Sequence, residues 1–177
     1  MDTDHPPAEH AIEKYLSSME SLLHEFIERS PFELTFSIRK AAAEAEDPES
    51  PEYIVDLSGP DADLLLEKNA TLLHAIEYVV LKAIRLDEDH FRRIAFDCQD
   101  WRRTRMEELR LMAQVAAERV IDTGDPFTLN PMNPRERRIV HLALKDRPEV
   151  RTQSEGMGPE RKVMILPANL PSRGGRR

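Results

Sequence analysis

The stretch LLLEKNATLL (residues 64–73) decides how the first half of the chain is interpreted. Its leucines are spaced as in amphipathic helices, so one helix is expected to end at the break and another to begin after it. The break contains no glycine, although tight connections commonly use glycine to reach left-handed backbone conformations. An acid, Glu67, stands at its first position. The sequence therefore predicts a helix over 62–66, a tight break over 67–70 and a longer helix over 71–85.

The patterns around this break predict an α+β first half. Apolar residues recur every three or four positions before Pro31, as in an amphipathic helix, whereas residues 33–39 alternate between apolar and polar, as in a half-buried strand. Asp61 stands where it can cap the helix that follows it. The expected elements are, in order, a helix over 8–29, strands over 33–39 and 52–57, helices over 62–66 and 71–85, and a strand over 91–97.

The second half is predicted to combine two helices with a three-stranded sheet. Its clearest signal is a helix start, with Asn133 as the N-cap, Pro134 at the first helical position and Glu136 three residues after the cap. The expected elements are a helix over 100–122, a strand over 126–130, a helix over 134–146, and strands over 149–153 and 161–166. Residues 168–177 are predicted to be a disordered basic tail.

The net charge of −8 over 177 residues hides an uneven distribution. Residues 1–67 contain 17 acids and 4 bases, net −13, whereas residues 68–177 contain 16 acids and 21 bases, net +5. A basic binding surface near the C-terminal end is one interpretation, and two solvated faces of unlike sign are the alternative. A single cysteine, the absence of a long apolar run and an acidic start without a signal-peptide pattern indicate a cytoplasmic protein.

A basic row on the helix expected over 134–146 is the first candidate site. Arg137, His141 and Lys145 recur at every fourth position and therefore lie on one face. Arginine offers a planar fork of donors to phosphate, and histidine donates a hydrogen bond or stacks on a base. The row can contact a nucleic-acid backbone, or it can be an ordinary solvated face. The apolar residues expected to anchor this helix to a core are Ile139, Leu142 and Ala143.

The sequence around this row resembles a known domain. The segments PMNPRERRIVHLAL (131–144), VRTQSEG (150–156) and RKVMILP (161–167) are similar to the domain named for its Arg-x-x-x-His signature (R-three-H). More narrowly, about residues 50–167 resemble the bacterial Jag family, the SpoIIIJ-associated or KhpB-like proteins. The flanking residues carry this resemblance, because Arg-x-x-x-His alone occurs by chance. The family implies a KH domain followed by an Arg-x-x-x-His domain, and binding of single-stranded RNA or DNA.

The resemblance assigns nucleic-acid binding to particular residues. Arg137 and His141 match the signature pair. Further phosphate contacts are implied in the matching segments, at Arg138, Thr152, Ser154 and Arg161. Thr152 and Ser154 also have a structural interpretation, in which their hydroxyls cap the turn over 154–159.

The resemblance also changes the meaning of the glycine-free break. A KH domain grips four nucleotides with a Gly-x-x-Gly loop between two helices, and residues 67–70 occupy that place with both glycines replaced. Glu67 puts a carboxylate where a phosphate passes, which costs on the order of 1 kcal/mol. Lys68 and Asn69 remain candidate phosphate contacts, although Asn69 is alternatively the N-cap of the next helix.

No pattern in the sequence indicates catalysis, a metal site or a cofactor. The histidines lack metal-ligand spacing, and Cys98 has no Cys or His partner nearby, so it is interpreted as a small buried hydrophobic residue. Trp101 is expected to pack at a domain joint. The arginines that follow it, at positions 102, 103 and 105, form either a solvated face or an extension of a binding surface.

The sequence thus predicts a non-enzymatic protein of the Jag type that binds single-stranded RNA or DNA, mainly through its Arg-x-x-x-His domain. The alternative is a protein-interaction or dimerisation module that kept the fold and lost RNA binding, with a second copy or a KH-family protein as the partner. The expected domains are an N-terminal helix within 1–30, a degenerate type II KH domain over 31–99, an Arg-x-x-x-His domain over 100–167 and the tail over 168–177.

Overall fold

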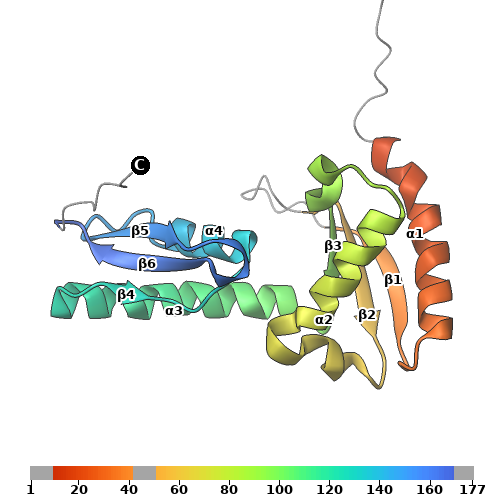
Figure 1. Cartoon of the computed structure of the whole chain (residues 1–177), viewed down its shortest axis with the longest axis horizontal. Coiled ribbons are helices and arrows are strands. Elements are labelled where there is room, and N and C mark those ends of the chain that lie inside the picture. Colours follow the sequence, from red (N-terminus) through yellow and green to blue (C-terminus); the bar gives the residue numbers. More distant parts are fainter. Residues whose placement is uncertain (1–9, 42–50, 170–177) are drawn as a thin grey trace, which may run out of the picture. The chain divides into compact units, whose positions relative to one another are not determined.

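The chain folds into two compact units, residues 1–102 and 103–177, in a computed structural model that describes residues 10–41 and 51–169. Each unit combines helices with a small three-stranded sheet (Figure 1), so the predicted α+β class is confirmed. The predicted basic tail lies outside the described residues from position 170 onward. Within the described ranges, every helix is too short or too polar to cross a bilayer.

In the first unit, two helices pack on one face of a sheet. Its elements are α1 (His10–Arg29), β1 (Thr35–Lys40), β2 (Tyr53–Ser58), α2 (Ala62–Ala83), the 3-10 turn η1 (Glu88–Arg93) and β3 (Ile94–Asp97). β2 lies in the centre, antiparallel to β1 and parallel to β3. Alternate strand residues such as Val55 and Leu57 join Met19 of α1 and Leu73 of α2 in a single buried core.

The strand predicted over 91–97 is shorter than expected. It begins only at Ile94, which pairs with Tyr53, the first residue of β2. The preceding residues instead form η1, which is fixed by the Arg93 guanidinium donating to both carboxylate oxygens of Glu52, at 2.5 and 2.7 Å.

One prediction about a side chain beside α2 is also wrong. The Asp61 carboxylate does not cap the helix; its Oδ2 accepts the backbone N–H of Glu33 at 2.8 Å. The buried row of the helix runs through Leu73, Ile76 and Val80, and Val79 beside this row is 60% exposed.

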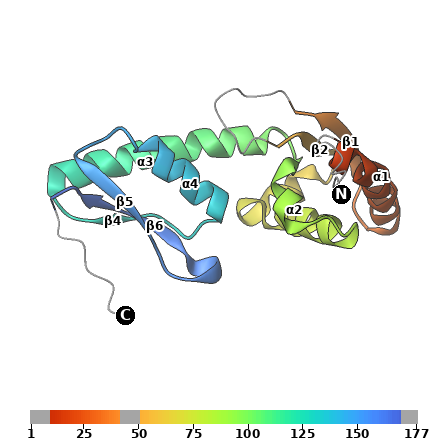
Figure 2. The same cartoon turned by 90° about the horizontal axis from the view of Figure 1, so that it is seen from above.

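The second unit places two helices on an antiparallel sheet of order β4–β6–β5 (Figure 2). Its elements are α3 (Trp101–Thr123), β4 (Phe127–Thr128), α4 (Pro134–Ala143), β5 (Val150–Glu155), the 3-10 turn η2 (Gly158–Glu160) and β6 (Lys162–Pro167). The core joins one face of α3 to Val140 of α4 and to Val163 and Ile165 of β6. α3 begins within the first unit, where Trp101 packs edge-on against His74 with ring centroids 5.3 Å apart.

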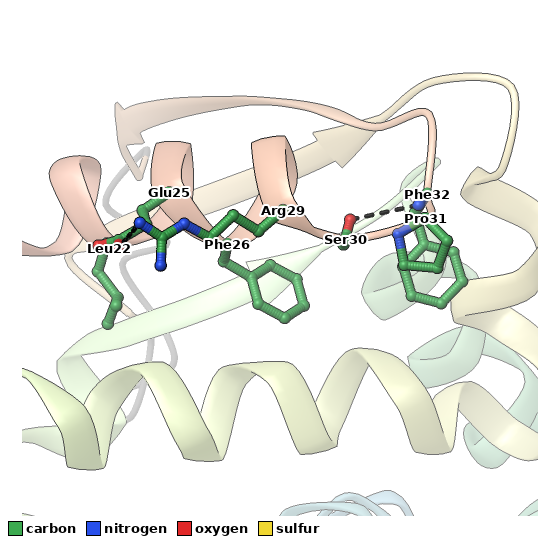
Figure 3. Close-up of a pocket in the computed structure, with 7 residues that line it drawn as sticks. All are labelled: Leu22, Glu25, Phe26, Arg29, Ser30, Pro31 and Phe32. Atoms are coloured by element: carbon green, nitrogen blue, oxygen red, sulfur yellow. Dashed lines mark hydrogen bonds and ion pairs between the residues drawn. The ribbon is translucent and has the colours of Figure 1, made fainter.

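A shallow apolar depression lies at the C-terminal end of α1 (Figure 3). Leu22, Phe26 and Phe32 contribute its half-buried apolar lining, and the exposed ion pair between Glu25 and Arg29 stands beside them. None of the residues predicted to bind nucleic acid contributes to it. The predicted binding residues therefore lie on other surfaces of the chain.

Candidate nucleic-acid interface

The helix that carries the Arg-x-x-x-His signature begins where the sequence predicts. Asn133 is extended and its side chain accepts the Glu136 backbone N–H at 2.9 Å, while the Glu136 carboxylate accepts the Asn133 backbone N–H at 3.0 Å. This reciprocal capping box, with proline at the start, satisfies N–H groups that a helix end otherwise leaves without partners. α4 therefore starts at a fixed residue, and the row that contains Arg137 and His141 has a fixed direction.

Glu136 does more than cap the helix. Its side chain is only 8% exposed, and its second carboxylate oxygen accepts a hydrogen bond from Arg105 Nε of α3 at 2.7 Å. Arg105 is itself 15% exposed and also pairs with Glu108 at 3.2 Å. Because a buried carboxylate requires such a partner, the contact holds the first turn of α4 against α3. The sequence indicated the cap and missed this contact.

α4 is shorter than predicted, which changes the position of Lys145. The helix ends at Ala143, and the buried Leu144 leaves the helical conformation with φ −111° and ψ 6°. Pro148 prevents the helix from resuming, because proline disfavours helical backbone at the residue before it, Arg147. Lys145 is exposed, but it lies beyond the helix rather than on its basic face.

Ile139 and Ala143 pack against the second core as expected, and only Leu142 departs from the predicted core-facing side of α4. Val140 and Leu144 are buried, whereas Leu142 is 52% exposed. Since each residue advances about 100° around a helix, Leu142 points away from the row that contains Val140. Arg137 and His141 each follow directly after a residue of the buried row, so they lie at the edge of the buried face of α4 and are half-buried.

His141 connects α4 to the neighbouring strand. Its Nδ1 lies 2.5 Å from the Thr152 hydroxyl and its Nε2 lies 3.0 Å from the Ser154 hydroxyl. Thr152 and Ser154 are two positions apart on β5, so they point to the same side of the strand. Among the described residues both hydroxyls contact His141 and neither bonds the backbone of the turn over 154–159, so their interpretation as turn caps is wrong. The signature histidine is instead held at both ring nitrogens.

The surroundings of His141 favour its neutral form. Burial lowers the pKa of the imidazole below its usual value, and the positive charge of Arg137 lowers the pKa further. A neutral ring has one donor and one acceptor nitrogen, and the two hydroxyls use both. What remains for a ligand is the face of the ring and its carbon edge.

The cations of the second unit differ in whether they have an acidic partner. Across the described residues, the side chains of Arg137, Lys145 and Arg161 form no ion pair. Arg161 follows η2, at the end of the β5–β6 hairpin that carries Ser154. Arg138 is exposed on α4 and interacts with other groups of the chain.

The arginine run at the start of α3 is a different case. Arg102 donates to the Phe96 carbonyl at 3.1 Å and lies 3.8 Å from Glu77, Arg103 pairs with Glu107, and Arg105 is buried against Glu136. These arginines maintain the structure around the start of α3. They are poor candidates for extending a binding surface, because an anionic ligand would have to compete with their carboxylate partners.

Comparison with known proteins matches the same region. A family model described as the R-three-H domain, the Arg-x-x-x-His domain, matches residues 107–167, which include the Arg137–His141 pair, Thr152, Ser154 and Arg161. Proteins named RNA-binding protein KhpB align with the chain: the one from Clostridium symbiosum is 35% identical over 114 residues, and the one from Bacillus subtilis is 29% identical over 111 residues. The chain carries an Arg-x-x-x-His domain and is homologous to the KhpB proteins of the Jag family.

The chain spans about half the length of these Jag-family relatives. The alignments cover 64% of the chain and 51% of the C. symbiosum protein, and 62% of the chain and 53% of the B. subtilis protein. A third relative named KhpB, from Lactiplantibacillus plantarum, is 29% identical over 102 residues, which are 58% of the chain and 32% of that protein. The family signature residues described above all lie in the second unit.

The glycine-free break in α2 adopts an unusual backbone. Glu67 is extended, with φ −56° and ψ 150°, and the next three residues, Lys68, Asn69 and Ala70, all have positive φ, at 49°, 66° and 56°. Left-handed backbone costs a residue with a side chain about 1–2 kcal/mol, somewhat less for Asn. The predicted break is thus confirmed, and its shape is the one for which glycine is normally used.

The side chains of this break have different environments. Lys68 and Asn69 are exposed, whereas Ala70 is fully buried in the first core. The Lys68 carbonyl accepts the Thr71 hydroxyl at 2.6 Å, and within the described residues Asn69 forms no side-chain hydrogen bond. Its left-handed backbone is also not the extended one of an N-cap, so the capping interpretation of Asn69 has no support. Lys68 and Asn69 belong to the first unit, and the α4–β5 residues to the second.

Proposed function

We propose that this chain binds single-stranded RNA, chiefly through the α4–β5 surface of its second unit, and acts as a binding protein rather than an enzyme. The observation that carries the proposal is the combination of an Arg137 side chain that forms no ion pair with any described residue and a His141 ring fixed beside it by Thr152 and Ser154. A rigid ring next to a planar cationic fork suits one nucleotide, with its phosphate on the arginine and its base or sugar on the ring. The names of the relatives, RNA-binding protein KhpB, support this assignment.

In this proposal the predicted site residues have distinct roles. Arg137 binds phosphate directly, and Arg161, Lys145 and Arg138 attract neighbouring phosphates. The hydroxyls of Thr152 and Ser154 orient His141 instead of contacting phosphate, because both already lie at hydrogen-bond distance from its ring.

The division of charge supports placing the main site in the second unit. Residues 103–177 contain 10 acids and 15 bases, net +5, whereas residues 1–102 contain 23 acids and 10 bases, net −13. RNA is a polyanion, so its approach is favoured toward the second unit and opposed toward the first.

We further propose that the first unit is a type II KH domain with a degenerate loop. The element order, the pairing of β2 with an antiparallel and a parallel neighbour, and the break between two helical segments support this. Residues 67–70 then occupy the place of the Gly-x-x-Gly loop. The exposed Glu67 carboxylate opposes phosphate there, so Lys68 and Asn69 contribute at most a secondary contact.

Binding of a short fluorescent single-stranded RNA, measured by anisotropy at several salt concentrations, tests the main proposal. The affinity is expected to fall with salt, with a slope of about 0.7 per phosphate contact on a double-logarithmic plot. Arg137→Ala removes a charge-assisted hydrogen bond worth roughly 1.5–3 kcal/mol, which is tenfold or more in affinity, and lowers that slope by about one contact.

Arg103→Ala is the matched control. Arg103 has the same charge in the same unit, is 73% exposed and already pairs with Glu107. Its removal is expected to change RNA affinity much less than Arg137→Ala. If no binding occurs at low salt, or if Arg137→Ala combined with His141→Ala binds as the unchanged protein does, the proposal is wrong and the protein-interaction alternative gains support.

A further inference from the structure

The tip of the β5–β6 hairpin presents an apolar side chain to solvent. Met157 is 85% exposed, more than any other large hydrophobic residue in the described part of the chain, where the next are Leu111 and Val115 at 62%. Exposing so much apolar surface has no benefit for folding, because the same side chain would be favoured in a buried position. A ligand that covers Met157 would supply the missing contact.

The backbone around Met157 has a defined shape. Gly156 and Gly158 on either side have positive φ, at 91° and 54°, whereas Met157 itself is extended with φ −133° and ψ 153°. A Cβ atom on Gly156 would lie 3.0 Å from the Glu160 carbonyl oxygen, so glycine at this position allows the close approach of the η2 backbone to the end of β5. The turn then closes with the Arg161 N–H donating to the Gly158 carbonyl at 3.2 Å. Met157 is therefore held at the hairpin tip by the backbone.

The hairpin leads from Met157 directly to the proposed site. Ser154, which holds His141, is three positions before Met157, and Arg161 is four positions after it. At about 3.3 Å per extended residue, the Met157 and Ser154 backbones are on the order of 10 Å apart. A single strand whose phosphate lies on Arg137 thus has further nucleotides within reach of the hairpin tip.

We propose that Met157 packs against a nucleobase of the bound strand, next to the nucleotide held by Arg137 and His141. This inference rests on the proposed function. A flexible, polarizable thioether fits the flat face of a base, and apolar side chains are known to insert between bases. Arg137 and Arg161, which form no ion pair within residues 10–41 and 51–169, favour a polyanionic strand over an apolar protein surface as the occupant. Met157 contributes contact with bases, whereas the arginines contribute contact with phosphates.

The two kinds of contact can be separated with two oligonucleotides. The first is a single-stranded oligonucleotide with all its bases, and the second has the same length with abasic sugars throughout. Met157→Ala is expected to weaken binding of the first by roughly fivefold, from the apolar area it no longer covers, without changing the salt slope. It is expected to leave binding of the abasic strand unchanged. Leu111→Ala, which removes another exposed side chain from the same unit, should change neither.

The outcomes distinguish this inference from the proposed function. If Arg137→Ala weakens binding and Met157→Ala does not, the contact with a base is disproved and the proposed site remains. Equal weakening of both oligonucleotides by Met157→Ala would also disprove it, because an abasic strand offers no base to contact. If Arg137→Ala has no effect, or the unchanged protein binds neither strand, both proposals are wrong.

Discussion

Replacing Glu136 with alanine should destabilise the second unit far more than its single position on a short helix suggests. The carboxylate accepts the Asn133 N–H at 3.0 Å and Arg105 Nε at 2.7 Å, and its side chain is 8% exposed. Loss of the capping contact costs about 1 kcal/mol. Breaking a buried ion pair by removing one partner costs about 3–5 kcal/mol, because the other charge stays buried. Arg105 keeps a contact with Glu108, which reduces this, so we expect roughly 3 kcal/mol in total.

Glu108→Ala is the matched control for this prediction. It removes the other carboxylate beside Arg105, but the Glu108 side chain is 54% exposed. Exposed ion pairs are worth less than about 1 kcal/mol, so this variant should remain close to the unchanged protein. Both variants remove one carboxylate partner of Arg105, so a difference between their effects on stability reports the burial of the Glu136 carboxylate.

Urea unfolding followed by two signals measures the effect. The single tryptophan, Trp101, packs in the first core, so its fluorescence reports on the first unit. Amide hydrogen exchange within α4 reports on the second unit. Glu136→Ala should strongly lower the protection of the α4 backbone amides against hydrogen exchange and leave the urea midpoint of the Trp101 fluorescence transition nearly unchanged. If Glu136→Ala and Glu108→Ala lower the protection of α4 equally, then Glu136 is not the buried anchor of α4 and the reasoning fails.

Three further predictions concern other sites. Lys68→Gly removes left-handed strain of about 1–2 kcal/mol but adds freedom to the unfolded chain, so the free energy of unfolding of the first unit should be unchanged or up to about 1 kcal/mol higher. The control Ala75→Gly, in the regular part of α2, should lower that free energy by about 1 kcal/mol. Equal losses for the two variants in urea unfolding would contradict the φ of 49° at Lys68. Burial raises the pKa of the Cys98 thiol to about 11, and the thiolate is the form that reacts with alkylating reagents. Alkylation of Cys98 at pH 8 should therefore require unfolding, and rapid labelling of the native chain would contradict this. The pKa of His141 is lowered in the free protein, and a bound phosphate should raise it. Binding then takes up a proton, so the affinity for RNA should increase as pH falls from 7 toward 5. An equal increase in the His141→Gln variant would show that another group titrates.

Local signals account for what the sequence predicted well. The start of α4 depends on Asn133, Pro134 and Glu136, which interact within four residues of one another, and the structure has the predicted capping box. The break at 67–70 was recognisable because apolar periodicity stops and restarts across it. In both cases the information and the contact lie in the same short segment, so no knowledge of the tertiary structure is needed.

Contacts between distant segments account for what the sequence missed. Periodicity shows that Arg137 and His141 share a row, but it does not show which neighbouring row faces the core, and Leu142 was assigned to the wrong one. The contacts of His141 with Thr152 and Ser154 join residues 11 and 13 positions apart, and they depend on where β5 lies beside α4. The local signal for them was a pair of hydroxyls two positions apart, Thr152 within the strand predicted over 149–153 and Ser154 just beyond it.

The pairing of arginines matters more for the proposed site than their number. The start of α3 has three arginines within four positions, yet Arg103 and Arg105 pair with carboxylates of the same unit. Replacing such a partner with phosphate exchanges one ion pair for another and gains little, whereas a phosphate on Arg137 gains a charge-assisted contact that nothing in the described structure supplies. A modest basic excess concentrated on such residues can therefore localise RNA on the α4–β5 surface, even in a chain whose net charge is −8.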